Sequence, residues 1–205
     1  MNVFVYLAPG FEEIEAITVI DYLRRAKVNV TTVSVPEKDS DEISSIVTGS
    51  HGIPVITDMV LHDCKNLENL PDAVYFPGGM PGAENLASNN FLFTLITKME
   101  EENKIIAAMC AAPAVVLAKT GVLSNRKWTC YPGMEEEILN SSENSVQIAE
   151  LMENSVHVKN VPFVFDNNVL TGRGPGTAEE FAMKFVELMT SEETATSIHN
   201  GSCQR

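Results

Sequence analysis

Basic residues are scarce in this chain, which carries 14 Lys and Arg against 28 Asp and Glu, for a formal net charge of −14. An acidic surface of this kind repels phosphate backbones and anionic lipid headgroups. We therefore expect neither nucleic acid nor a membrane among the partners. Long apolar runs are also missing. The run from Val3 to Leu7 is far too short for a signal peptide or a membrane span.

Cysteine is sparse as well. The four cysteines are widely spaced and form no C-x-x-C pair: Cys64, Cys110, Cys130 and Cys203. This spacing argues against a zinc site or a disulfide framework and favours a reducing compartment. We therefore expect a cytoplasmic protein without a metal or other cofactor. A chain of 205 residues needs neither a disulfide nor a metal for stability, because it can bury roughly 70% of its unfolded surface.

Strand-like and helical segments alternate along the chain. Short apolar or β-branched runs predict strands at residues 2–7, 28–35, 73–76, from 105, 161–165 and 169–171. Residues 43–57 resemble an irregular hairpin. Helical spacing predicts helices at residues 12–26, 91–102, from Cys110 to a cap at Gly121, 135–139 and from Thr177, which pairs with Glu180 in a capping box. The alternation predicts an α/β domain over residues 1–190, with a mostly parallel sheet and helices on both faces. Residues 191–205 are expected to form a short helix and tail.

The segment around Cys110 is the most informative one. An apolar, strand-like run from Ile105 ends at this cysteine, and a helix-forming run begins at once. The pattern is typical of a nucleophile elbow, in which a sharp turn raises the thiol. A helix N-terminus also favours thiolate through its dipole. A small buried cysteine between two packed elements gives the same pattern, so this segment alone leaves both interpretations open.

Two other loops follow predicted strands. Sites in such folds form where strand C-termini meet helix N-termini, so residues 8–15, 77–83 and 109–112 should converge. The first loop carries Glu12, Glu13 and Glu15, which also suit the first turn of a helix. A carboxyl buried beside a thiol would stay protonated, donate a hydrogen bond to the sulfur and serve as a general acid or base.

The second loop, Pro77-Gly78-Gly79, is either a tight turn or a set of backbone donors. Glycines let backbone N–H groups approach a ligand closely. With the amide of Ala111, these groups could form an oxyanion hole for a carbonyl adduct on Cys110.

Four ordered motifs carry a resemblance over nearly the whole chain: residues 8–15 (APGFEEIE), 77–79 (PGG), 107–113 (AAMCAAP) and 174–177 (GPGT). Together they resemble the ThiJ/PfpI superfamily, in the branch of the parkinsonism-associated deglycase (the DJ-one branch) and its bacterial YajL-type relatives. The resemblance implies a flavodoxin-like three-layer α/β sandwich, a homodimer and a strained cysteine elbow. It implies Cys110 as the nucleophile, Glu15 as the protonated carboxyl bonded to it, and backbone amides from Gly79 and Ala111.

The resemblance also implies a function. The family is credited with glyoxalase activity on methylglyoxal without glutathione and with removal of early glycation adducts. We therefore expect a stress-protection enzyme that acts on a small reactive carbonyl or glycated substrate, with Glu15 as the proton shuttle. The alternative is a redox sensor or chaperone in which Cys110 is oxidised to sulfinic acid. An amidotransferase or cysteine protease would need a histidine base, and His157 has no obvious carboxylate partner in the sequence.

One position departs from the family pattern. Many relatives place a histidine where this chain has Tyr131, and tyrosine, with a reference pKa of about 10, is a poor base. His51 stands where relatives often carry an arginine near the pocket, so it is either a ligand contact or a plain loop histidine. Cys130 is either a resolving thiol for an oxidised Cys110 or a packed thiol at a strand end.

Overall fold

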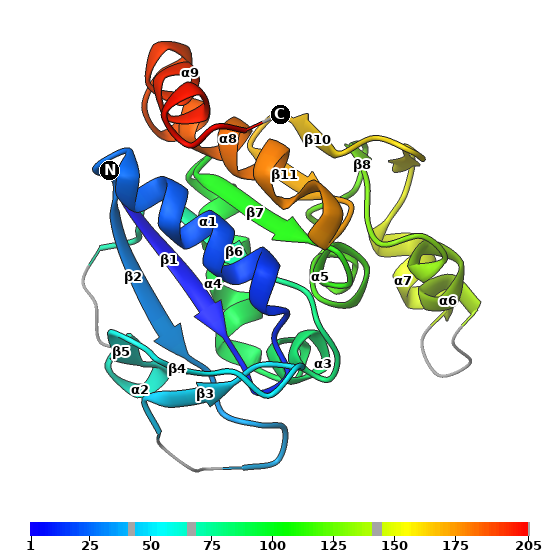
Figure 1. The fold of residues 1–205 in the computed structure, drawn as a ribbon. Helices are drawn as coiled ribbons and strands as arrows, with labels where there is room; N and C mark the ends of the chain where they lie inside the picture. The colour runs from blue at the N-terminus through cyan, green and yellow to red at the C-terminus, as the bar shows by residue number, and fades with distance from the viewer. Residues whose placement is uncertain (41–43, 65–68, 141–144, 205) are drawn as a thin grey trace.

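The computed structural model describes residues 1–40, 44–64, 69–140 and 145–204. Figure 1 shows the fold. The strands are β1 (Asn2–Leu7), β2 (Asn29–Ser34), β3 (Ile46–Thr48), β4 (Pro54–Ile56), β5 (Met59–Val60), β6 (Ala73–Phe76), β7 (Ile105–Met109), β8 (Lys127–Trp128), β9 (Val156–His157), β10 (Phe163–Asp166) and β11 (Val169–Gly172). The α-helices are α1 (Glu13–Arg25), α2 (Leu61–Cys64), α3 (Gly82–Ala87), α4 (Asn90–Glu101), α5 (Ala112–Val115), α6 (Met134–Asn140), α7 (Ser145–Leu151), α8 (Ala178–Met189) and α9 (Glu192–Gly201).

A seven-stranded sheet with the order β10-β11-β7-β6-β1-β2-β5 forms the centre of the molecule. All neighbouring pairs are parallel except β10 and β11, which pair in antiparallel register from Phe163 opposite Gly172 to Asp166 opposite Val169. The five strands β2-β1-β6-β7-β11 follow the flavodoxin-like order, whose switch point lies between β1 and β6. This arrangement confirms the predicted flavodoxin-like α/β fold.

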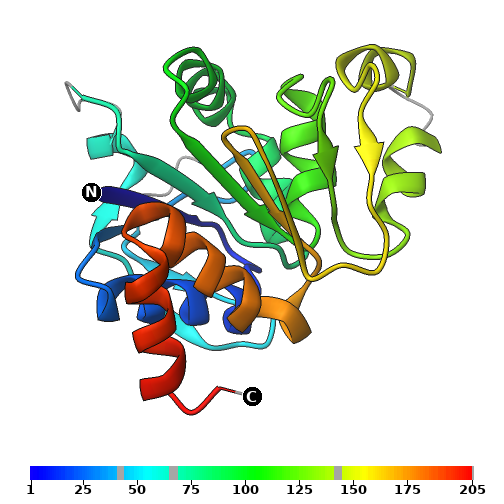
Figure 2. The same cartoon turned by 90° about the horizontal axis from the view of Figure 1, so that it is seen from above.

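Helices cover both faces of the sheet, and Figure 2 shows the three layers from above. Alternate residues of each strand face opposite layers. On β7, for example, Ile106 and Ala108 join one apolar core, while Ala107 and Met109 join the other. Helices α1, α8 and α9 pack on the second face, and α4, α5 and α7 on the first. The sandwich is therefore a real three-layer core rather than a sheet covered on one side.

Most predicted elements lie within two residues of their observed bounds, and the differences have local causes. The capping box at Thr177 is wrong, because the Thr177 hydroxyl donates to the carbonyls of Gly174 (2.9 Å) and Pro162 (3.3 Å). The short helix predicted within residues 191–205 is present as α9, whose N-cap Ser191 accepts from the Thr194 N–H. The predicted hairpin exists as β3 and β4, although its first residue, Ile43, lies outside the described residues.

A small lobe was predicted only through its helix at residues 135–139, which is α6. Beyond the β10 edge of the sheet, the two-residue strands β8 and β9 pair in parallel beside α6 and α7. Their sequences are too short and mixed to show a period. In the part of the chain that the structure describes, no helix has the length and apolar character needed to cross a bilayer.

Candidate active site

The ends of β1, β6 and β7 bring three loops together at the switch point of the sheet. Phe11 is fully buried in the loop after β1, and the Glu12 N–H donates to the Gly78 carbonyl across 2.9 Å. Gly82, at the start of α3, donates to the Gly10 carbonyl. The first two loops therefore meet through their own backbone groups, and the third lies against Gly78 through Cys110 and Ala111.

Cys110 occupies a sharp turn directly after β7. Its φ is +61°, a left-handed conformation that non-glycine residues rarely adopt and that costs backbone strain. Two hydrogen bonds hold it there: the Cys110 N–H donates to the Gly172 carbonyl (2.9 Å), and the Tyr131 N–H donates to the Cys110 carbonyl (2.8 Å). The residue is 9% exposed, so Cys110 is almost closed off from solvent.

The Glu15 side chain lies beside this thiol with no exposed surface. Its Oε2 accepts a 2.7 Å hydrogen bond from the Gly78 N–H. Its Oε1 is buried and, among the described residues, has no hydrogen bond of regular geometry. The Cys110 thiol is close enough to shift the pKa of the carboxyl, so Oε1 is the oxygen left to engage the sulfur.

Gly78 shows how tightly the two side chains converge. A Cβ atom at this residue would lie 2.6 Å from Cys110 Cβ, 2.8 Å from Glu15 Oε2 and 3.0 Å from the Ala111 nitrogen. Real Cβ contacts are longer than the first two distances. Only glycine therefore leaves room for the acid and the thiol on the same side of the loop.

The pKa values of the pair depend on each other. Burial raises the pKa of Glu15 to about 7, against smaller lowering effects of the Gly78 N–H and of Cys110. Burial and the Glu15 charge raise the pKa of the Cys110 thiol, which the Ala111 and Gly79 amides lower in part. Because two negative charges cannot share this dry site, Cys110 forms a thiolate most readily while Glu15 keeps its proton.

Of the three backbone amides expected around the sulfur, those of Gly78, Gly79 and Ala111, one has another partner. The N–H groups of Gly79 and Ala111 act on the Cys110 sulfur as hydrogen-bond donors. The Gly78 N–H, which we expected to face a reacting oxygen, is committed to Glu15. Gly78 therefore positions the acid, and two amides remain for an oxyanion.

The helix after Cys110 is much shorter than expected. Helix α5 spans only Ala112–Val115, and a 3₁₀ turn (Leu117–Lys119) follows it. The Thr120 hydroxyl and N–H both bond the Leu117 carbonyl, which tightens the chain before Gly121 can cap a full helix. One turn has a small dipole, so the local amides and Glu15 act on the thiol more than a helix end does.

The other candidate residues lie around this centre in different ways. His51 pairs with Glu13 (Nδ1 to Oε2, 2.8 Å), and its side chain is 70% exposed. Hydrogen bonds from His51 outweigh the burial that would raise the Glu13 pKa, and the result is a value of about 2. Tyr131 contacts the site through its backbone, while its ring is 49% exposed and lies against Gly174.

Cys130 lies in the other core, away from the layer that holds Cys110. Its Sγ lies 3.7 Å from His157 Nε2 and 4.0 Å from Glu135 Oε2. His157 does have a carboxylate partner, since its Nδ1 lies 3.3 Å from Glu135 Oε1. Sequence reasoning missed this partner because the residues are 22 positions apart, on α6 and at the end of β9.

Known proteins are similar to this chain over most of its length. A family model described as the DJ-1/PfpI family matches residues 1–188. The chain is 34% identical over 192 residues to "Protein DJ-1 homolog B" of Arabidopsis thaliana, covering 94% of this chain but only 39% of that protein. It is 33% identical to "Protein dj-1beta" of Drosophila melanogaster, covering 98% of this chain and 95% of that protein.

A solved structure and a named glyoxalase are also similar to this chain. The crystal structure of Drosophila melanogaster DJ-1beta superimposes with a TM-score of 0.83 at 32% identity, covering 100% of this chain and 98% of that one. The chain is 28% identical to "Glutathione-independent glyoxalase DJR-1.2" of Caenorhabditis elegans, over 83% of this chain and 94% of that protein. The family match over most of the chain, joined to a shared fold, shows that this chain belongs to the DJ-1/PfpI family.

Proposed function

We propose that this protein converts small 2-oxoaldehydes such as methylglyoxal to 2-hydroxy acids without glutathione, through Cys110 and Glu15. One observation carries the proposal: a fully buried carboxyl, with a pKa of about 7, lies beside a thiol at a strained elbow. A group that titrates near neutral pH can both accept and return a proton. The glyoxalase named among the relatives supports this substrate class.

The chemistry balances with these groups and one water molecule. The Cys110 thiolate adds to the aldehyde carbon, and the new oxyanion accepts hydrogen bonds from the Gly79 and Ala111 amides. Glu15 gives its proton to this oxyanion, which forms the hemithioacetal and leaves Glu15 as a carboxylate. Glu15 then takes the proton from the former aldehyde carbon and returns it to the neighbouring carbon, which converts the hemithioacetal to a thioester of the hydroxy acid. Water hydrolyses the thioester, which releases lactate in the case of methylglyoxal and restores the thiol.

Glu15 has to act as the shuttle because Tyr131 does not replace a histidine. The Tyr131 ring is half exposed, and its contact with the site is the backbone N–H. The same chemistry extends to early glycation adducts. Each is a hemiaminal or hemithioacetal of the same aldehyde carbon, and its amine or thiol leaves as the aldehyde re-forms for Cys110.

The test is lactate formation from methylglyoxal in the absence of glutathione. Cys110→Ser should abolish it, and Glu15→Gln should lower kcat by about 100-fold or more, the usual loss for a positioned acid–base group. Glu15→Gln should still be alkylated at Cys110, because the amide keeps a hydrogen-bond donor beside the sulfur. Cys64→Ser is the matched cysteine control, since Cys64 packs against the Tyr6 hydroxyl at 3.3 Å, and it should retain activity. Turnover that survives in Cys110→Ser would refute the proposal.

Oxidation of Cys110 is the second candidate function. Oε1 of Glu15 has no hydrogen bond of regular geometry among the residues described, and together with the two amides it could hold oxygen atoms on the sulfur. Peroxide would convert the thiolate to sulfenate and then to sulfinate, with water or hydroxide as the leaving product. Mild peroxide should add about 32 Da at Cys110 before any other cysteine. First oxidation at the exposed Cys203 would argue against this role.

We also propose a homodimer, formed through an apolar surface at one end of the molecule. Exposed isoleucines cluster on α1 and on the β3–β4 hairpin, whose loop bonds the start of α1 through the Ser50 N–H and the Phe11 carbonyl. They are Ile14, Ile17, Ile46, Ile53 and Ile56, each 45–78% exposed. Ile17→Glu should shift the mass in analytical ultracentrifugation from two chains to one. If the variant and the unchanged protein have the same mass, the isoleucine surface is not the dimer interface. We also propose that the protein is cytoplasmic, because its four cysteines are unpaired and the cytoplasm is reducing.

A further inference from the structure

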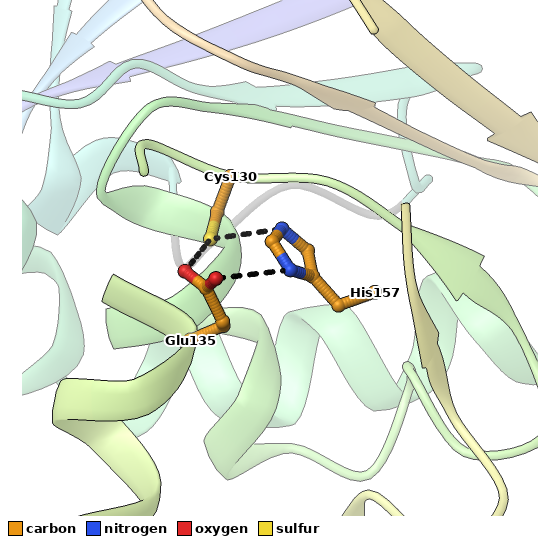
Figure 3. A group of neighbouring side chains, drawn as sticks. All are labelled: Cys130, Glu135 and His157. Carbon is orange, nitrogen blue, oxygen red and sulfur yellow. Dashed lines mark hydrogen bonds and ion pairs between the residues drawn. The ribbon is translucent and has the colours of Figure 1, made fainter. Parts of the chain in front are cut away.

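The Cys130–Glu135–His157 cluster lies outside the Cys110 site and takes no part in the proposed reaction. Figure 3 shows the three side chains pointing toward one another. Cys130 follows β8, Glu135 lies in the first turn of α6, and His157 ends β9. Among the described residues, only one other group of three such ligands comes together, formed by Glu12, Glu13 and His51.

We propose that Cys130, Glu135 and His157 form a binding site for a thiophilic divalent cation, with Zn²⁺ as the ion that fits best. One sulfur, one imidazole nitrogen and one carboxylate oxygen are donors that Zn²⁺ accepts, whereas Mg²⁺ and Ca²⁺ prefer oxygen alone. Three protein ligands leave the fourth tetrahedral position for water. Binding replaces the thiol proton, which leaves to solvent.

The distances between donors support this site. Zn–S and Zn–N bonds of about 2.3 and 2.0 Å at a tetrahedral angle place the two donors about 3.6 Å apart. Cys130 Sγ and His157 Nε2 are 3.7 Å apart, and Glu135 Oε2 is 4.0 Å from the sulfur. One donor atom from each residue lies within 4.8 Å of the others. The two distances from the sulfur therefore exceed the tetrahedral spacing by less than about half an ångström.

The surroundings favour an ion over a substrate. Cys130 is only 2% exposed, so a nucleophile here would have no access to a carbonyl compound. The side chains of Glu135 and His157 are 10% and 14% exposed, which leaves an entry path from their side. Outer contacts also hold the ligands: the Gly133 N–H donates to Glu135 Oε2 (2.8 Å), and the His157 ring packs on Trp128 with centroids 4.9 Å apart.

His157 has an unmet requirement that an ion would relieve. Its Nδ1 is buried and, within the described part of the chain, makes no hydrogen bond of regular geometry despite the nearby carboxylate. Burial of a polar nitrogen without a partner is costly. Coordination through one ring nitrogen would allow the ring and the carboxylate to reorient, so that the other nitrogen could bond as in known metal–histidine sites.

Lys159 pairs with one of the three proposed ligands, Glu135. Its Nζ lies 3.1 Å from Glu135 Oε1, and its side chain is 61% exposed. The ammonium competes with a cation for the same carboxylate, and its long exposed chain can swing away. Removal of this charge should therefore strengthen metal binding, an effect that a purely structural cluster would not show.

The test uses the full chain with Cys110→Ser, so that the site thiol cannot bind the metal. We expect Zn²⁺ to bind with one ion per chain in isothermal titration, and Co²⁺ to give a thiolate-to-metal charge-transfer band in the near ultraviolet. Adding Cys130→Ser should remove the band. Adding His157→Gln or Glu135→Gln should weaken Zn²⁺ binding by about tenfold or more. Lys159→Ala should strengthen it by about fivefold, because it removes a like charge within a few ångströms.

Controls separate this site from the others. His51→Gln in the same background tests the second ligand group and should leave Zn²⁺ binding unchanged, as should Cys64→Ser. Zn²⁺ should also raise the melting temperature by a few degrees, since it binds only the folded chain. A charge-transfer band that persists in Cys130→Ser would overturn the proposal. So would an unchanged or weaker affinity in Lys159→Ala, a surface change that leaves the three ligands and the core intact.

Discussion

The backbone N–H of Tyr131 donates a 2.8 Å hydrogen bond to the carbonyl of Cys110. Tyr131 therefore supports the elbow through its main chain, whatever its side chain. The same bond joins the two sites, because Cys130, one residue earlier, faces Glu135 and His157. An ion bound there would hold the segment that fixes the nucleophile.

This relationship predicts that the Tyr131 side chain is dispensable. Tyr131→Phe keeps the backbone donor and the ring contact with Gly174, so kcat/KM for methylglyoxal should stay within about twofold, the usual range for surface changes of up to 0.5 kcal/mol. The measurement is steady-state lactate formation over pH 6–9. A loss of tenfold or more, or a shifted pH profile, would show that the phenol takes part in the reaction.

Gly78 should be intolerant of any side chain. A Cβ atom there would meet Cys110 Cβ at 2.6 Å and Glu15 Oε2 at 2.8 Å, so Gly78→Ala must displace the thiol or the acid. We expect it to lower stability by about 1–3 kcal/mol, as overpacking does, and to reduce turnover to near background. Denaturant unfolding and lactate formation measure the two effects.

Gly176→Ala is the matched control for that change. Its added Cβ would have no heavy atom within 4 Å, and its φ is not in the positive range. Stability and activity should both remain near those of the unchanged protein. Equal losses in the two variants would mean that close packing at Gly78 is not the cause.

The buried Glu15 carboxyl predicts a specific pH dependence of stability. Its pKa is about 7 in the folded protein and 4.5 in the reference state. Between these values the folded chain keeps a proton that the unfolded chain has lost, so stability falls as pH rises through the window. The loss should total about 3 kcal/mol between pH 4.5 and 8.

Glu15→Gln removes this titration, and the comparison with the unchanged chain isolates it. The difference in free energy of unfolding, unchanged protein minus variant, should decrease steadily from pH 4.5 to 8 in urea titrations. A difference that stays flat across that range would show that Glu15 is ionised throughout. Glu15 could then not act as the proton shuttle.

The Glu13–His51 pair predicts the opposite sign at lower pH. Burial would raise the Glu13 pKa, but hydrogen bonds from His51 and other groups bring it to about 2. The ionised Glu13 therefore adds to the free energy of unfolding above pH 4.5, the reference pKa, and this contribution is lost as pH falls toward 2. Glu13→Gln should cost about 2 kcal/mol at pH 7, the size of a few charged hydrogen bonds, and much less at pH 3. Equal costs at both pH values would contradict the assignment.

Local sequence patterns were enough to place the main elements. The β-branched and apolar runs that became β1, β6 and β7 are continuous because strands buried on both faces need no alternation. Their ends marked the three loops, and the match of four motifs assigned Cys110 and Glu15 to one site. The same local reasoning failed at Thr177, where the hydroxyl found carbonyls of Gly174 and Pro162 instead of an amide.

The sequence by itself determined the α/β class, the family and the pairing of Cys110 with a buried acid, since each of these follows from residues that are close in the chain or from ordered motifs. Only the tertiary structure decided that the Gly78 amide serves Glu15, that α5 lasts a single turn, and that His157 meets Glu135 and Cys130. The physical reason is the same in each case. Hydrogen bonds and ligand clusters depend on distances of a few ångströms between residues tens of positions apart, and only the packing of the layers sets those distances.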